Sequence, residues 1–269
     1  MLNILSKPVG NARAIWHLIT SRHRKALCDL PPTLYEYWSR TAQTEFQGIP
    51  RDAFFYVRAA DALLDFFECA RRNNHPCALP SMAADSVWHA WLRHSPATLD
   101  AFCERHFSQR IPHVEAGDMA GGMALPLAMS LVTARRLDGL PLAAPSVPGL
   151  FGTDRALRMP GGFAYALRGN DLVCSRIDRR GQTVGTGQMH PALTPDFLLA
   201  AGLIARIDYE GWLPRRQARD TGGVAGNATE VTCEVAGDVA GNVASAADGG
   251  DSGGGSGCGG GCGGGGCGS

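Results

Sequence analysis

Hydrophobic residues recur at helical spacing through the first half of the chain. In the segment 33–46, every fourth position is apolar: Leu34, Trp38, Ala42 and Phe46. This spacing predicts an amphipathic helix with one buried stripe. Thr33 followed by Glu36 has the pattern of a capping box and places the beginning of the helix directly after Pro32.

The most regular pattern lies between Asp52 and Asn73. Apolar residues form a seam along one side of the predicted helix: Tyr56, Ala60, Leu63, Phe67 and Ala70. Polar residues form a stripe on the opposite side: Arg58, Asp61, Asp65, Glu68 and Arg72. Asp52 can serve as the N-cap. The pattern predicts a core helix whose polar side is exposed to solvent.

Two further helices are predicted over about 83–93 and 96–107. The first would bury Val87, Trp88, Trp91 and Leu92, and the second would bury Leu99, Phe102, Cys103 and Phe107. Ser95 can cap the second helix, with Pro96 at its first helical position. If the two helices pack as an antiparallel pair, His89 and Cys103 or His106 could converge on a metal.

The period changes in the second half of the chain. Residues 120–137 predict another helix, and the Pro- and Gly-rich segment 138–162 predicts a long loop. Three short strand-like runs within 163–189 are separated by turn residues, which predicts a small antiparallel meander. A last helix is expected from Thr194 to about Arg206. The predicted fold class is therefore mainly α, with a helical bundle head and a small antiparallel β-meander.

The C-terminal segment has a different composition. No aromatic residue follows Trp212, and residues 249–269 contain 14 glycines. Ordering a residue costs about 1–2 kcal/mol, and glycine has no side chain to bury in return, so a disordered tail is predicted. We divide the chain into a helical domain (1–137), a loop, meander and closing helix packed on it (138–220), and a disordered acidic Gly/Cys-rich tail (221–269).

Charge and cysteine content narrow the function classes. The chain has 25 basic and 25 acidic residues, but five of the acids lie after residue 220, where no Lys or Arg occurs. Residues 1–220 therefore contain 25 basic and 20 acidic residues. This excess of five positive charges is too small to indicate a nucleic-acid-binding surface, so a protein partner is expected. No signal peptide and no run of about 20 apolar residues is visible, which favours a cytoplasmic protein. Nine cysteines then indicate reduced thiols or metal ligands.

Two stretches of the sequence carry a family resemblance. The first comprises Pro80-Ser81, Asp85, Trp88-His89, Ala101-Phe102-Cys103 and Ile111 to His113. The second comprises Leu150-Phe151, Asp154, Pro160-Gly161-Gly162-Phe163 and Tyr165. The pattern resembles the bacterial glycine-rich domain-containing proteins and, distantly, the helical region of the plant glycine-rich domain proteins. The chain departs from that pattern at His94 and in the insert 221–247. The resemblance implies a helical fold and no particular activity.

The first stretch also holds the main candidate for chemistry. Asp85 and His89 are four residues apart on one predicted helix, so they are neighbours on its surface. An aspartate that accepts a hydrogen bond from one ring nitrogen leaves the other nitrogen free to bind a metal. Candidate ligands are His89, Cys103, His106 and His113, with Asp85 and Trp88 in support. Zinc or another thiophilic metal would need three or four of them.

Two alternatives to this site stay open at the level of sequence. In the first, Trp88 and Cys103 belong to the core, His89 is an interface histidine bonded to Asp85, and His94 and His106 are exposed. In the second, Cys103 is a catalytic nucleophile. A reactive cysteine needs a lowered pKa and an open pocket, whereas Cys103 is predicted to point inward.

The tail supplies a second candidate site, made of Cys258, Cys262 and Cys267. Their spacing could chelate a soft metal or serve redox or metal buffering. The alternative is a flexible, solubilising tail with free thiols.

The leading prediction for function is a non-enzymatic interaction or scaffold module with a flexible thiol-bearing tail. It rests on strong apolar periodicity and on the absence of phosphate-binding loops and nucleophile elbows from the sequence. The alternatives are a metal-binding protein or metalloenzyme that uses His89 with Cys103, His106 or His113, and a redox or metal-buffering tail.

Overall fold

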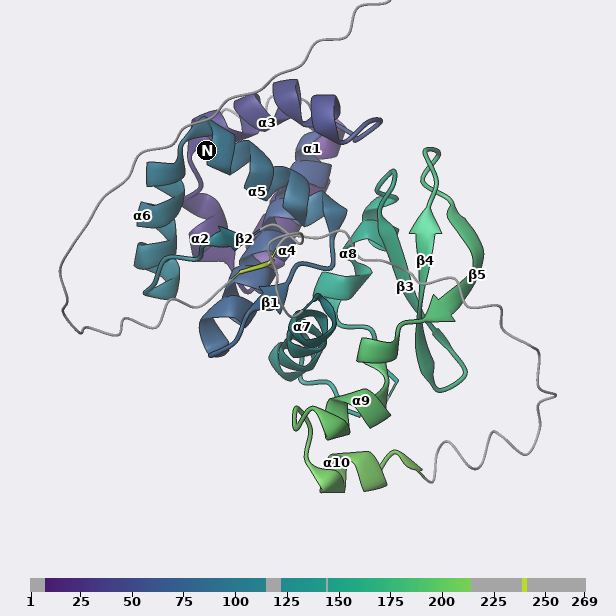
Figure 1. Cartoon of the computed structure of the whole chain (residues 1–269). Coiled ribbons are helices and arrows are strands. Elements are labelled where there is room, and N and C mark those ends of the chain that lie inside the picture. The colour runs from purple at the N-terminus through teal and green to yellow at the C-terminus, as the bar shows by residue number, and fades with distance from the viewer. Residues whose placement is uncertain (1–7, 115–121, 144, 214–238, 241–269) are drawn as a thin grey trace, which may run out of the picture.

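The computed structural model describes residues 8–114, 122–143, 145–213 and 239–240 (Figure 1). The first half is helical and consists of α1 (Pro8–Thr20), α2 (Arg24–Cys28), α3 (Pro32–Glu45), α4 (Ala53–Arg72), α5 (Met82–His94) and α6 (Pro96–Phe107). The second half adds α7 (Ala124–Leu137), α8 (Gly149–Leu157), β3 (Phe163–Arg168), β4 (Asp171–Ile177), β5 (Thr183–Met189), α9 (Pro195–Ala200) and α10 (Arg206–Glu210). The predicted mainly α fold with a small antiparallel meander is confirmed.

Helix α4 forms the centre of the core, as its apolar seam predicts. Its aromatic residues Phe66 and Phe67 pack against Trp88 of α5 at ring-centroid distances of 5.4 and 5.5 Å. Asp52 caps α4 by accepting a 3.0 Å hydrogen bond from the backbone N–H of Phe55, which confirms its predicted role. The capping box predicted at Thr33 is wrong, because α3 begins one residue earlier and Pro31 occupies the N-cap position.

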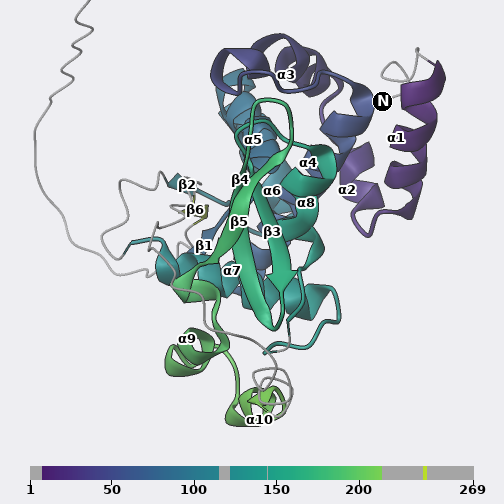
Figure 2. The same cartoon turned by 90° about the vertical axis from the view of Figure 1, so that its right-hand side faces the viewer.

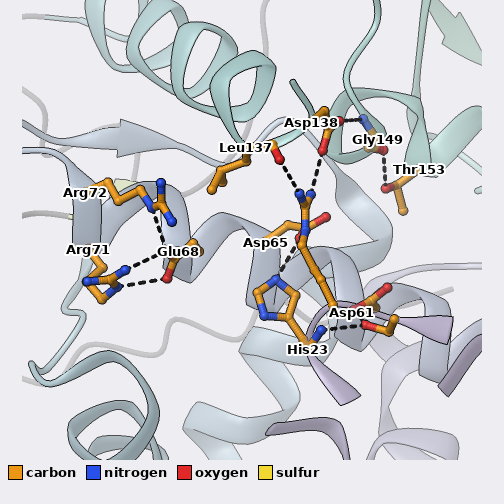
Figure 3. Close-up of polar contacts among 12 residues, drawn as sticks. His23, Asp61, Asp65, Glu68, Arg71, Arg72, Leu137, Asp138, Gly149 and Thr153 are labelled. Atoms are coloured by element: carbon orange, nitrogen blue, oxygen red, sulfur yellow. Dashed lines mark hydrogen bonds and ion pairs between the residues drawn. The ribbon is translucent and has the colours of Figure 1, made fainter. Parts of the chain in front are cut away.

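The polar side of α4 is partly buried over most of its length, contrary to the prediction of a solvated face, and is exposed at Arg72. Helices α1 and α2 pack against α4, and His17 lies 2.7 Å from Asp61. His23 lies 2.8 Å from Asp65 (Figure 3). Burial acts against the charge on Asp65, but hydrogen bonds from His23 and Arg22 hold the pKa of its carboxyl below the usual value. These partners lie about 40 residues away in the sequence, so helical periodicity alone treats the face as exposed.

Arg22 extends this network to the second half of the chain. Its guanidinium donates to Asp65 at 2.8 Å and to Asp138 at 2.7 Å, at the C-terminal end of α7. The other oxygen of Asp138 accepts from the backbone N–H of Gly149, where α8 begins (Figure 3). One loop residue therefore connects α4, α7 and α8.

The segment 138–162 contains α8 and is not the continuous loop that its Pro and Gly content predicts. Pro148 supplies the N-cap position, and Leu150, Phe151 and Leu157 are buried. The helix lies between α4 and β3 (Figure 1), with the Phe151 ring 4.9 Å from that of Tyr165. The Pro and Gly content of the segment predicted a loop, but both residues are also common at helix ends.

Asp154 of α8 joins three elements in the core. Its fully buried carboxylate accepts hydrogen bonds from the Ser81 hydroxyl at 2.7 Å and from three backbone N–H groups at 3.0 Å each, those of Met82, Ala83 and Phe163. Burial raises the pKa of Asp154, while the four donors act in the opposite direction. A Cβ on Gly162 would lie 2.6 Å from this carboxylate, so only glycine fits beside it.

Strands β3, β4 and β5 pair antiparallel in this order, which confirms the meander. The closing helix is shorter than predicted. Helix α9 ends at Ala200, because Gly202 adopts a left-handed conformation with φ of 69°, and α10 begins only at Arg206.

A second, smaller sheet contains a part of the C-terminal region. Strand β6 (Val239–Ala240) lies between β1 (Cys77–Ala78) and β2 (His113–Val114) and pairs antiparallel with both (Figure 2). The predicted disordered tail thus contributes one short strand, which needs only backbone groups to form. The rest of 221–269, including Cys258, Cys262 and Cys267, lies outside the described residues. Within the described part of the chain, no helix has the length and apolar character required to cross a bilayer.

Candidate metal centre

Three of the side chains singled out in the sequence converge on one point. Asp85 and His89 lie one turn apart on α5, and His113 reaches them from β2. The Nε2 atom of His89 is 3.2 Å from Nε2 of His113 and 3.6 Å from Oδ1 of Asp85. All three potential ligand atoms lie within 4.8 Å of one another.

These spacings match the coordination geometry of zinc. Two ligand atoms bonded to one tetrahedral zinc ion at about 2.0–2.1 Å lie about 3.3–3.4 Å apart. The observed separations of 3.2 and 3.6 Å bracket this value. The third separation, between the ligand atoms of Asp85 and His113, lies within 4.8 Å. An ion shared by the three side chains would have a fourth coordination position for water or another ligand.

Glu45, at the C-terminal end of α3, orients the His89 ring. Its Oε1 atom lies 2.5 Å from Nδ1 of His89, and its other oxygen is bound by Arg93. Because a carboxylate accepts hydrogen bonds, Nδ1 carries the ring proton and Nε2 keeps its lone pair for a metal. The sequence assigns this orienting role to Asp85, but Asp85 faces Nε2 instead.

Sequence reasoning missed Glu45 altogether. It is 44 residues from His89, and the contact exists because α3 packs against α5. No local pattern signals such a pair, since helical spacing relates only residues three or four apart.

Aromatic rings hold the two imidazoles in place. The His113 ring lies 4.6 Å from the fully buried Trp88, with an interplanar angle of 80°. The rings of His89 and Phe46 lie 5.9 Å apart. Trp88 thus packs against His113, and the rings restrict rotation of both imidazoles.

The structure does not bring Cys103 and His106 to this cluster. Cys103 is buried in the α6 interface, and burial raises the pKa of its thiol to about 12, so the thiolate that metal binding or catalysis requires is disfavoured. Nε2 of His106 lies 3.1 Å from Asp29, and burial lowers the pKa of the His106 ring. His94 contacts the Thr33 hydroxyl at 3.0 Å.

Comparison with known proteins adds no relative. No protein-family model, curated protein or solved structure matches the chain. The resemblance to glycine-rich domain proteins therefore stays a prediction.

The role of Glu45 leads to a testable prediction. Replacing it by glutamine removes the negative charge that holds the Nδ1 proton, and such outer partners are worth about 10–100-fold in metal affinity. We expect Glu45→Gln to weaken zinc binding by about that factor in a calorimetric titration. Glu36→Gln, at an exposed position of the same helix, is the matched control. Equal zinc affinity in the two variants would show that Glu45 does not support the site.

Proposed function

We propose that this protein binds one divalent transition-metal ion, with zinc the best match, through Asp85, His89 and His113. The observation that carries the proposal is the spacing of the three ligand atoms, 3.2 and 3.6 Å from the central nitrogen. Two imidazoles and a carboxylate suit zinc and related metals, whereas calcium and magnesium prefer oxygen ligands.

The number of protein ligands bears on what the ion would do. Structural zinc sites have four protein ligands, whereas catalytic sites have three and keep one position open. A site with Asp85, His89 and His113 belongs to the open type, so the ion can bind an exchangeable ligand. The His89 side chain is 23% exposed, which gives such a ligand access from solvent.

The proposal is tested by metal stoichiometry in a chain without the tail thiols. Purified protein is stripped with a chelator, dialysed against zinc, freed of excess and analysed by elemental mass spectrometry. Full-length protein and a variant lacking 249–269 should each retain at least one equivalent. Less than a tenth of an equivalent in the shortened variant would remove the proposal and leave the buffering tail as the source of any uptake.

An interaction module is the second candidate function, because α1 exposes an apolar stripe. Ile15, Trp16 and Ile19 are exposed by 37, 70 and 50%. Ile19 lies four residues after Ile15 and three after Trp16, so the three side chains share one side of the helix. A protein partner would bury this face. Any partner isolated with the chain should bind a Trp16→Ser variant at least about tenfold more weakly, because tryptophans dominate interface energies. Equal affinity for both chains would exclude the α1 face.

A further inference from the structure

Strand β6 pairs with the strand that carries a metal-site histidine. Ala240 is opposite His113 and Val239 is opposite Val114, while on its other side Ala240 is opposite Cys77 and Val239 is opposite Ala78. Among the described strands, β6 is the partner through which β2 belongs to a sheet. The C-terminal segment thus fills a slot between two strands of the head (Figure 2).

The two strands that flank β6 differ in their burial and contacts. In β1, Cys77 and Ala78 are fully buried, the Ser130 hydroxyl donates to the Ala78 carbonyl at 2.7 Å, and Asn73 contacts the Cys77 sulfur at 3.3 Å. Strand β2 has two partly buried residues. Strand β6 therefore connects a fully buried strand to a partly buried one.

The position of the His113 ring depends on that connection. Backbone N–H and C=O groups need partners, and removal of β6 takes the ladder partners from β2. The 3.2 Å approach of His113 to His89 is then supported by side-chain contacts such as the ring packing against Trp88, without the backbone pairing to β6. Conversely, a metal bonded to both histidines fixes β2 to α5 and preserves the slot for β6.

We propose that metal binding at Asp85, His89 and His113 is coupled to docking of the Val239–Ala240 strand, each favouring the other through His113. This coupling rests on the proposed metal function and makes the Val239–Ala240 strand a regulator of the same site. Coupling between two binding events is reciprocal, because each changes the affinity of the other by the same factor. A protein or condition that withdraws the strand would thereby loosen the metal.

The test replaces Ala240 by proline in the full chain and in the chain lacking 249–269. Proline has no N–H and is not tolerated in a central strand. We expect Ala240→Pro to weaken zinc binding by about 5–20-fold in calorimetry, within the usual range of coupling. Val231→Pro, in the same C-terminal region but outside the strand, should bind zinc like the unmodified chain.

Hydrogen exchange provides the reciprocal measurement. Zinc should slow amide exchange at 77–78, 113–114 and 239–240 in the unmodified chain and have less effect there in Ala240→Pro. If the unmodified chain binds zinc and Ala240→Pro binds it equally well, the coupling is overturned while the metal function stands. If the unmodified chain binds no zinc, the proposed function itself has failed.

Discussion

Replacing His113 by alanine is expected to reduce zinc affinity by more than about 100-fold. The variant removes one of three ligands, and even an outer partner of a ligand is worth about 10–100-fold. His89→Ala should have an effect at least as large, because His89 is the ligand closest to both of the others. Zinc titration of each variant, in the chain lacking 249–269, measures the loss.

His94→Ala is the matched control for these variants. His94 lies on the same helix as His89, but its ring contacts Thr33. Its removal should leave zinc affinity unchanged. A loss of affinity in His94→Ala equal to that in His113→Ala would mean that binding does not depend on the three-residue cluster.

Replacing Asp154 by asparagine is expected to destabilise the protein by about 3–5 kcal/mol, since hydrogen bonds to charged groups are worth about 1.5–3 kcal/mol each. Each carboxylate oxygen accepts two hydrogen bonds. Oδ1 accepts from the Ser81 hydroxyl and the backbone N–H of Ala83, and Oδ2 accepts from the backbone N–H groups of Met82 and Phe163. An amide nitrogen would face donors in either orientation. The free energy of unfolding from chemical denaturation measures the effect.

Asp196→Asn provides the comparison for Asp154. Asp196 is exposed and accepts a hydrogen bond from the Tyr209 hydroxyl, which an amide oxygen can also accept. We expect a change within about 0.5 kcal/mol, as is usual for surface substitutions. Similar effects of both substitutions would mean that Asp154 does not hold α5, α8 and β3 together.

Asp154 also gives a physical account of the two stretches that carry the family resemblance. Ser81 belongs to the first stretch, and Asp154 and Phe163 belong to the second. The two segments are joined by hydrogen bonds to the Asp154 carboxylate. This carboxylate leaves no room for a side chain at position 162, which is glycine. These residues thus connect the helical half to the meander.

The elements that sequence predicts well are those with local signals. The apolar seam of α4, the N-cap at Asp52 and the turn residues between the strands of the meander are signals from residues a few positions apart. Helix α8 escaped prediction because Gly149 and Gly152 resemble loop residues, although packing of Leu150 and Phe151 outweighs their low helix propensity.

The sequence singled out Asp85, His89 and His113 but not their arrangement or the contact with Glu45. His89 and Asp85 share a helix face by spacing, and His113 was one of several further ligands considered. The orientation of α6 keeps two other candidates out of the site, since it directs Cys103 into the core and His106 toward Asp29. The roles of Glu45 and of strand β6 depend on contacts across more than 40 residues, which periodicity does not encode.

X-ray absorption at the zinc edge tests the central claim most directly. Full-length protein loaded with one equivalent of zinc should show nitrogen and oxygen neighbours at about 2.0–2.1 Å, with an imidazole signature from two histidines. A first shell dominated by sulfur at about 2.3 Å would contradict the account, because it would place the ion on cysteines and away from Asp85, His89 and His113.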